Sequence, residues 1–374
     1  MSTLASLPSQ LSLASRTRRF AQNPLVQPTD LSPSGPGLEI ACVLNPGVFR
    51  RDGRTYLLVR VAEGAIACPG RVRVPVLSQG KVEVLDFAAD DPDLNTSDPR
   101  EFKYKGQGLL STLSHLRLLV SEDGIRFTEV PGGRYFGEGY AESYGIEDPR
   151  VNVLDDGRTL ITYTAVSPVG YGIGARMTRD WLSFEKLGLL LPTPNKDAAL
   201  FPCTFSGRYL MINRPTSAIV GGSDIWLSAS PDLHHWGDHK CIVQRRPLNW
   251  DSGRIGVNGP PIRTEAGWLV MYHGADSNKR YRLGAVLLDL ADPSCVLART
   301  AEPIMEPEAD YELKGFFNAV VFSNGHLCDG KTITLYYGAA DTVICGATLQ
   351  LADVLAALGI KAQDDCTSAS PACP

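Results

Sequence analysis

The sequence of 374 residues contains no run of apolar residues long enough to cross a membrane. A membrane-spanning helix needs about 18 or more such residues in succession, and the N-terminal segment also lacks the continuous apolar stretch of a signal peptide. Basic residues are not in excess either, because 36 Lys and Arg stand against 41 Asp and Glu. Nucleic-acid-binding domains typically carry a basic surface. We therefore expect neither a membrane nor a nucleic acid as a partner.

The sequence also lacks a cysteine pattern typical of disulfides and the residue spacings typical of metal sites. The nine cysteines are an odd number, are scattered over the chain and form no Cys-x-x-Cys motif. Secreted proteins more often pair their cysteines. We therefore expect a reduced, cytoplasmic protein without a metal site, in which most cysteines are small core residues.

One pattern occurs five times along the chain. Each copy has a polar residue, a short apolar run, a Gly-centred turn and an alternating strand, and the copies span residues 45–64, 147–167, 196–215, 258–276 and 317–341. A second apolar strand follows each copy and leads into a turn with an aspartate, at Asp123, Asp180, Asp232, Asp292 and Asp353. Aspartate side chains commonly cap such turns.

These repeats predict the fold class. Alternating strands separated by Gly, Asp and Pro turns, without long amphipathic helices between them, predict an all-β fold. Internal repeats indicate stacked or radial units that cannot bury their apolar faces alone. Four short strands in each of five repeats predict a five-bladed β-propeller. A pair of β-sandwiches and a right-handed β-helix are the alternatives, but a β-helix needs a shorter period and a sandwich gives no reason for five matched copies.

The same reasoning divides the chain into parts. Residues 39–355 are predicted to form one propeller body, which closes when its last blade seals against the first. Residues 1–38 are predicted to form an N-terminal arm that packs on the rim of this body or on another subunit of a homo-oligomer. Residues 362–374 are predicted to be a disordered tail. An insertion at residues 70–111 separates the first two repeats, and loops of this length are commonly lids or binding loops, so we predict that it forms a wall of the substrate entrance.

Polar residues recur at equivalent points of the repeats. The first set is Asn45, Asp148, Lys196 with Asp197, Asn258 and Asn318, and the second is Arg60, Tyr163, Asn213 with Arg214, Tyr272 with His273, and Asp341. Equivalent positions of radially arranged blades converge on the axis. Their chemical types differ between repeats, which a purely structural repeat would not require, although each residue taken singly is also explained as a solvated turn residue.

The charged members of these sets separate into two groups. Asp148 and Asp341 are expected on one side with Asn45 and Arg60, and the other side is expected to hold Lys196, Arg214, Arg254 and His273. Clustered cations repel one another when unpaired, which indicates a phosphate-sized dianion as their occupant. A carboxyl facing an anion site suggests an acid that protonates a glycosidic oxygen. Inverting glycosidases commonly need a second carboxylate to activate water, but attack by phosphate needs no base.

Several motifs in combination resemble glycoside hydrolase family 130, the inverting β-mannoside phosphorylases and their few hydrolytic relatives. Between Asn45 and Leu349 the motifs are NPGV, YGIEDPRV, NKDAALFP, INRPT, SPDLHHW, GPPIRTEAGWLVMYHG, YRLGAVLLDL, GFFNAVVF and YYGAADT. The resemblance implies a five-bladed β-propeller enzyme. It also implies phosphorolysis of a non-reducing β-mannoside to α-mannose 1-phosphate, with inorganic phosphate as the co-substrate and no cofactor.

The resemblance further implies a role for each candidate residue. Asp148 is expected to be the general acid, acting on the glycosidic oxygen through the 3-hydroxyl of the sugar. The mannosyl unit is expected to be bound by Asn45, Arg60 and Asp341, and phosphate by Lys196, Arg214, Arg254, His273 and Tyr281. Arg150 is expected to be a structural partner of a blade carboxylate. Glu147 is expected to point away from Asp148, because adjacent strand residues face opposite sides.

The substrate and two other functions stay open. β-1,2-Mannobiose or a related manno-oligosaccharide is favoured over mannosyl-β-1,4-N-acetylglucosamine, with acceptor selectivity assigned to the insertion and to the region of His115. An inverting β-mannoside hydrolase is the second candidate, but it would need a carboxylate where the basic group stands. A non-catalytic carbohydrate-binding propeller is the third, and it leaves Asp148 and the basic group without a purpose.

Overall fold

A computed structural model of the chain describes residues 13–78, 80–98, 100–217 and 219–360, and the predicted all-β class is confirmed. Helices in this part of the chain are short. The α-helices are α1 (Leu13–Arg16), α2 (Asp310–Leu313) and α3 (Leu351–Ala357), and the 3₁₀ helices are η1 (Pro28–Asp30) and η2 (Tyr140–Glu142). Strands are therefore the main secondary structure of this part of the chain.

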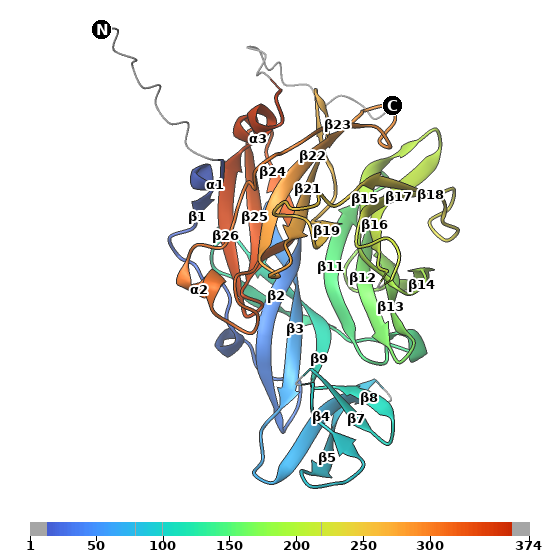
Figure 1. Cartoon of the computed structure of the whole chain (residues 1–374), viewed down its shortest axis with the longest axis vertical. Helices are drawn as coiled ribbons and strands as arrows, with labels where there is room; N and C mark the ends of the chain where they lie inside the picture. Colours follow the sequence, from blue (N-terminus) through green and yellow to red (C-terminus); the bar gives the residue numbers. More distant parts are fainter. Residues whose placement is uncertain (1–12, 79, 99, 218, 361–374) are drawn as a thin grey trace.

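Five antiparallel sheets follow one another along the chain (Figure 1). The first contains β2 (Leu38–Arg51), β3 (Arg54–Ala65), β9 (Thr112–Ser121) and β10 (Thr128–Tyr135). The second contains β11 (Ile146–Val153), β12 (Thr159–Ser167), β13 (Gly170–Thr178) and β14 (Glu185–Leu191). The third contains β15 (Asn195–Phe205), β16 (Arg208–Pro215), β17 (Ile225–Ser230) and β18 (Gly237–Val243).

The last two sheets depart slightly from this four-strand order. The fourth contains β19 (Arg254–Val257), β21 (Gly267–Ala275), β22 (Tyr281–Leu288) and β23 (Val296–Arg299), and β20 (Ile262–Thr264) also pairs with β21. The fifth contains β24 (Val321–Cys328), β25 (Thr332–Ala339) and β26 (Val343–Gln350), and its outer strand is β1 (Arg18–Arg19) from the start of the chain.

The sequence repeats correspond to a hairpin in each sheet. Four copies overlap the hairpins β2–β3, β11–β12, β15–β16 and β24–β25, and the fourth copy along the chain contains β20 and β21. The predicted turn caps are present at Asp123, Asp180 and Asp232, where one carboxylate oxygen accepts backbone N–H groups two and three residues further on. The prediction is wrong for Asp353, which lies in α3 and pairs with Arg16 at 2.7 Å.

The apolar core is divided into five large clusters, each between two successive sheets. Adjacent residues of one strand enter the clusters on its two sides, because successive side chains point to opposite faces. The contributing neighbours are Leu57 and Leu58, Leu160 and Ile161, Leu200 and Phe201, Trp268 and Leu269, and Leu335 and Tyr336. One cluster joins the fifth sheet to the first, through Tyr336 and Leu57. Every sheet is therefore buried on both faces.

The described part of the N-terminal arm packs on the fifth sheet of the same chain. Arg18 and Arg19 pair with β26, and Val26 forms a bridge with Ile344. The Arg19 guanidinium donates to Glu312, a fully buried carboxylate in α2, with Nε 2.8 Å from Oε1. The arm thus completes the fifth sheet and ties the chain start to the segment before β24.

The insertion forms two small sheets of its own. One pairs β4 (Arg71–Ser78) with β5 (Lys81–Ala88), and the other contains β6 (Leu94–Asn95), β7 (Glu101–Tyr104) and β8 (Gln107–Leu110). These strands extend beyond the five large sheets at the lower end of the molecule in Figure 1. The predicted long loop is therefore an ordered β-structure, and the predicted disordered tail lies outside the described residues.

The cysteines are less buried than predicted. Cys42, Cys203 and Cys345 are buried, but Cys68, Cys241 and Cys295 are exposed, so the expectation that most are core residues is only partly correct. Within the described residues, no group of His, Cys, Asp and Glu is arranged to hold a metal ion. In the same part of the chain, no helix has the length and apolarity needed to span a membrane.

Candidate active site

Three residues of the first predicted polar set share an uncommon backbone conformation. Asn45, Asp148 and Asp197 have φ values of 49°, 50° and 55°, in the left-handed region. Each lies where the pairing of its strand shifts, in β2, β11 and β15. Such bulges redirect side chains and are frequent beside active sites, and strained residues of this kind collect at functional sites. The repeats therefore meet at three matched bulges with polar side chains.

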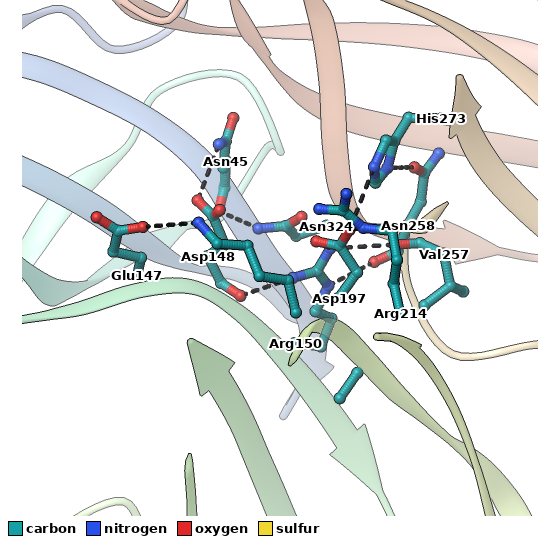
Figure 2. Close-up of polar contacts among 12 residues, drawn as sticks. Asn45, Glu147, Asp148, Arg150, Asp197, Arg214, Val257, Asn258, His273 and Asn324 are labelled. Atoms are coloured by element: carbon teal, nitrogen blue, oxygen red, sulfur yellow. Dashed lines mark hydrogen bonds and ion pairs between the residues drawn. The ribbon is translucent and has the colours of Figure 1, made fainter. Parts of the chain in front are cut away.

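Asp148 lies in a polar cluster drawn from the first two sheets. Its Oδ1 accepts hydrogen bonds from Asn45 Nδ2 at 2.9 Å and from an Arg60 terminal nitrogen at 3.1 Å. Arg60 also donates to Glu147 Oε1 at 2.9 Å and to the Ser114 hydroxyl at 3.0 Å. Figure 2 shows Asn45 and Asp148 directed toward each other. We name Asn45, Arg60, Glu147, Asp148 and Asp341 the acid cluster.

The expectation for Glu147 is wrong. Strict alternation would turn Glu147 away from Asp148, yet both carboxylates bind the same guanidinium of Arg60. The left-handed conformation of Asp148 at the bulge interrupts the alternation. Two carboxylates can therefore face one side of the strand.

The carboxyls of the acid cluster have opposed pKa shifts. Burial raises the pKa of Asp341 to about 6, and the charges of Asp148 and Glu147 add to this effect against Arg60. Burial also acts to raise the pKa of Asp148, but Arg60, Lys196, Arg150 and the Asn45 hydrogen bond outweigh it, so the pKa is lowered. Near neutral pH, Asp341 is therefore the carboxyl of this pair that holds a proton more readily.

This shift predicts a dependence of stability on pH. The folded protein holds the Asp341 proton more tightly than the unfolded chain, so this stabilising contribution is complete below about pH 4 and is lost as the pH rises through about 6. Asp341→Asn cannot ionise, so its free energy of unfolding relative to wild type should rise by about 1–3 kcal/mol from about pH 4 to about pH 7. Urea denaturation at several pH values measures this difference.

The control for this measurement is Asp90→Asn, at an exposed position of the insertion. Its stability relative to wild type should stay constant over the same pH range. A constant difference for Asp341→Asn as well would contradict the raised pKa of Asp341.

Two of the predicted basic residues, Arg214 and His273, contact a buried carboxylate. Asp197 accepts from Arg214 Nε at 2.5 Å, and its Oδ2 lies 3.3 Å from His273 Nε2. Its other oxygen accepts from Arg150 at 2.9 Å, which confirms Arg150 as a partner of a carboxylate. The expectation of unpaired cations is therefore wrong for Arg214, because Asp197 neutralises its charge. Burial lowers the pKa of His273, and Arg214 and Arg150 lower it further against the opposing effect of Asp197.

The other predicted phosphate residues lie on two sides of this group. A terminal nitrogen of Arg254 lies 3.3 Å from the Tyr281 hydroxyl, and the Tyr281 ring is centred 6.2 Å from the His273 ring. Lys196 instead reaches the acid cluster, with Nζ 3.5 Å from Glu147 Oε2 and 4.8 Å from the Tyr171 ring centre. Lys196 also lies opposite Arg214 in the pairing of β15 with β16, and it therefore links the two groups. We name Lys196, Arg214, Arg254, His273 and Tyr281 the basic cluster.

Arg150 lies between the two clusters (Figure 2). Its guanidinium is buried and donates to the backbone carbonyls of Asp148, Val257 and Asn258, each at 3.0 Å, as well as to Asp197. It therefore connects the second, third and fourth sheets. Asn324 makes a similar link, because its amide donates to the Asn45 carbonyl at 3.0 Å.

Several predicted members of the recurring sets lie elsewhere or act differently. Asn318 is exposed and bonds to its own loop, and the buried amide on the fifth sheet is Asn324.

The hydroxyls of Tyr163 and Tyr272 bond to Glu142 at 2.6 Å and Asp251 at 2.8 Å, outside both clusters. Asn258 is in place, and its Oδ1 lies 3.1 Å from His273 Nδ1.

His115 does not lie on an accessible surface. It is fully buried, accepts from Arg117 Nε at 2.9 Å and stacks on Phe136 at 4.4 Å. The side chain of His115 therefore does not itself face an acceptor sugar, because the strand β9 turns it into the interior. The neighbouring Ser114 is the β9 residue that reaches the acid cluster, through Arg60.

Comparison with known proteins gives the family. The family model described as beta-1,4-mannooligosaccharide phosphorylase, glycoside hydrolase family 130, matches residues 101–359. A beta-1,2-mannobiose phosphorylase from Listeria innocua is 39% identical over 354 residues, 92% of this chain and 99% of that protein. A 1,2-beta-oligomannan phosphorylase from Thermoanaerobacter is 44% identical over 245 residues, 65% of this chain and 80% of that protein.

The solved structure of the Listeria innocua beta-1,2-mannobiose phosphorylase in complex with beta-1,2-mannobiose is similar to most of this chain. The TM-score is 0.86 at 38% identity, with 92% of this chain and 99% of that chain covered. The chain belongs to glycoside hydrolase family 130.

Proposed function

We propose that this protein is an inverting β-mannoside phosphorylase. The observation that carries this proposal is the acid cluster around Asp148 lying next to the basic cluster, joined by the contact of Lys196 with Glu147 at 3.5 Å. Phosphate attacks the anomeric carbon of the non-reducing β-mannosyl unit and the glycosidic bond breaks. The products are α-mannose 1-phosphate and the released sugar, which takes up a proton at its oxygen.

Asp148 is proposed to supply this proton through the 3-hydroxyl of the mannosyl unit. Asn45, Arg60 and Asp341 bind that unit, since all three belong to the cluster around Asp148. The raised pKa of Asp341, about 6, means that this carboxyl holds a proton in mildly acidic solution, where an ordinary aspartate is ionised. The general acid must carry its proton when the bond breaks.

Phosphate is proposed to be held by the basic cluster. Arg214 and Arg254 provide guanidinium donors, which match phosphate oxygens well, and Lys196 provides a further positive charge. Burial raises the pKa of Tyr281, so its hydroxyl stays protonated and can donate. His273 Nε2 is buried and lies 3.3 Å from Asp197 Oδ2, without the alignment of a hydrogen bond.

The low pKa of the carboxylate within the basic cluster favours phosphorolysis over hydrolysis. An inverting hydrolase needs a carboxylate that can accept a proton from water. Asp197, the carboxylate within the basic cluster, is paired with two arginines, and Arg214 and Arg150 outweigh burial to hold its pKa well below the usual range. A carboxylate with so low a pKa is a weak general base.

The five sheets are proposed to form a five-bladed β-propeller. Support comes from the five apolar clusters between successive sheets, one of which joins the fifth sheet to the first. In a propeller of this kind, the matched bulges of β2, β11 and β15 lie near the axis. Residues 39–355 are proposed to be this catalytic body.

The favoured substrate is β-1,2-mannobiose or a related manno-oligosaccharide. The two relatives at 39% and 44% identity are named for β-1,2-linked mannosides. The insertion is proposed to border the acceptor sugar. Its strand β8 accepts a hydrogen bond at the Gly108 carbonyl from Tyr144, which precedes Glu147 and Asp148 by a few residues.

This function predicts the products and the acceptors. With β-1,2-mannobiose, the protein should release mannose 1-phosphate in phosphate buffer and form little free mannose beyond the acceptor product. In reverse, mannose 1-phosphate should be transferred to mannose in preference to glucose and N-acetylglucosamine. Anion-exchange chromatography separates the sugars from the sugar phosphate and measures both directions.

Each deviation has a distinct meaning. Complete conversion to mannose without phosphate would indicate the hydrolase, and inertness in both directions would indicate a binding protein. Transfer to N-acetylglucosamine with mannose ignored would contradict the linkage but leave the reaction class in place.

A further inference from the structure

Asp197 is a buried carboxylate to which the proposed reaction gives no role. Its side chain is 1% exposed, and its two oxygens accept hydrogen bonds from Arg150 and Arg214 at 2.9 and 2.5 Å. The oxygen that binds Arg214 also lies 3.3 Å from His273 Nε2. Asp197 therefore contacts Arg214 and His273 of the basic cluster. It also contacts Arg150, which donates to the Asp148 carbonyl.

Arg214 contacts Asp197 through Nε, the guanidinium nitrogen that is bonded to the aliphatic part of the side chain. Nε donates to Asp197, and no hydrogen bond from either terminal nitrogen of Arg214 is found among the described residues. A guanidinium is a planar fork with donors in fixed directions. Fixing Nε therefore fixes the directions in which the two terminal nitrogens can bind a ligand.

The charge of Asp197 also allows the two arginines to lie close together. The Arg150 and Arg214 side chains are 1% and 7% exposed, so water screens their mutual repulsion little. An anion between them offsets this repulsion. The left-handed bulge at Asp197, with φ of 55°, places its carboxylate in this position directly after Lys196.

We propose that Asp197 is a positioning residue for phosphate binding, which orients the terminal nitrogens of Arg214 toward the phosphate through its contact with Nε. This proposal rests on the proposed function, because phosphate is the ligand of the basic cluster there. Asp197 itself does not touch phosphate, since a carboxylate would repel it. Its effect is transmitted through Arg214.

A double-mutant cycle tests this transmission. Inorganic phosphate is titrated by calorimetry into wild type, Asp197→Asn, Arg214→Ala and the double variant. Each single variant is expected to bind phosphate about 10- to 100-fold more weakly, the loss of a charge-assisted hydrogen bond. The double variant is expected to bind no more weakly than Arg214→Ala. In turnover, the KM for phosphate should rise far more than the KM for the mannoside.

The control is Asp251→Asn, which also removes a buried carboxylate held by two arginines. Asp251 binds Arg246 at 2.8 Å and Arg299 at 2.5 Å, outside both clusters. Its loss should lower stability but leave phosphate affinity unchanged. Phosphate affinity like wild type in Asp197→Asn, or additive losses in the double variant, would overturn the proposal.

A second variant is used if Asp197→Asn does not fold. Arg214→Lys leaves the pair of Asp197 and Arg150 intact, but its ammonium has no rigid fork, so a contact with Asp197 no longer fixes the direction of donors toward phosphate. Phosphate binding should then fall nearly as far as in Arg214→Ala, and retained affinity would overturn the proposal. Because the titration needs no turnover, absent release of mannose 1-phosphate would refute the proposed reaction without deciding the role of Asp197. Absent phosphate binding by wild type would refute both.

Discussion

Asp148→Asn is expected to lower kcat for phosphorolysis by about 10²- to 10⁴-fold, the usual contribution of a general acid. The amide has nearly the same shape as the carboxyl but cannot donate a carboxylic proton. The substitution should be tolerated by the fold, because asparagine is among the residues that adopt the left-handed conformation readily, and Asp148 has φ of 50°. Initial rates of mannose 1-phosphate release measure the loss.

A matched control is Asp156→Asn, an exposed position in the turn between β11 and β12. It makes the same chemical change in the same hairpin, away from both clusters, and should keep the activity of wild type. Thermal melting of both variants separates loss of chemistry from loss of folding. If folded Asp148→Asn kept most of its activity, Asp148 would not be the general acid.

The second large effect is expected on stability. Arg150→Met should lower the free energy of unfolding by about 3–5 kcal/mol, the cost of removing one partner of a buried ion pair. The substitution leaves Asp197 with one arginine fewer and removes the donor to the carbonyls of Asp148, Val257 and Asn258. Urea denaturation followed by tryptophan fluorescence measures the change.

Arg158→Met is the control for this change. Arg158 lies near the turn of the same sheet, is 30% exposed and pairs with Asp156 at 2.6 Å. Its loss should cost less than about 1 kcal/mol, as for other surface ion pairs. Equal costs for the two variants would show that Arg150 does not hold the sheets together.

Much of the fold could be predicted because its determinants are local. Each sheet begins from a Gly- or Asp-centred hairpin, and these residues set the turns whatever lies around them. Adjacent apolar residues such as Leu57 and Leu58 mark strands that are buried on both faces, and this property is visible in the sequence. The identities of Asn45, Arg60, Asp148 and Asp341 could be found because the repeats align them.

The bulges limited the prediction of the site. A strand with regular alternation would separate Glu147 from Asp148, and only the left-handed backbone at Asp148 brings both to Arg60. The same kind of bulge at Asp197 turns a carboxylate into the group that was expected to contain only cations. Nothing in the spacing of charges shows that a strand shifts its register at these points.

The sequence by itself determined the all-β class, the five hairpins and the polar residues that the repeats bring into equivalent positions, because turns, alternation and repeats act over a few neighbouring residues. The tertiary structure decided which of these residues meet. Arg150 reaches Asp197, 47 positions away, and the Asn258 carbonyl, 108 positions away. It also decided that His115 is buried and that Asn324, not Asn318, faces Asn45. Such contacts join different sheets, and they depend on how the sheets pack against one another.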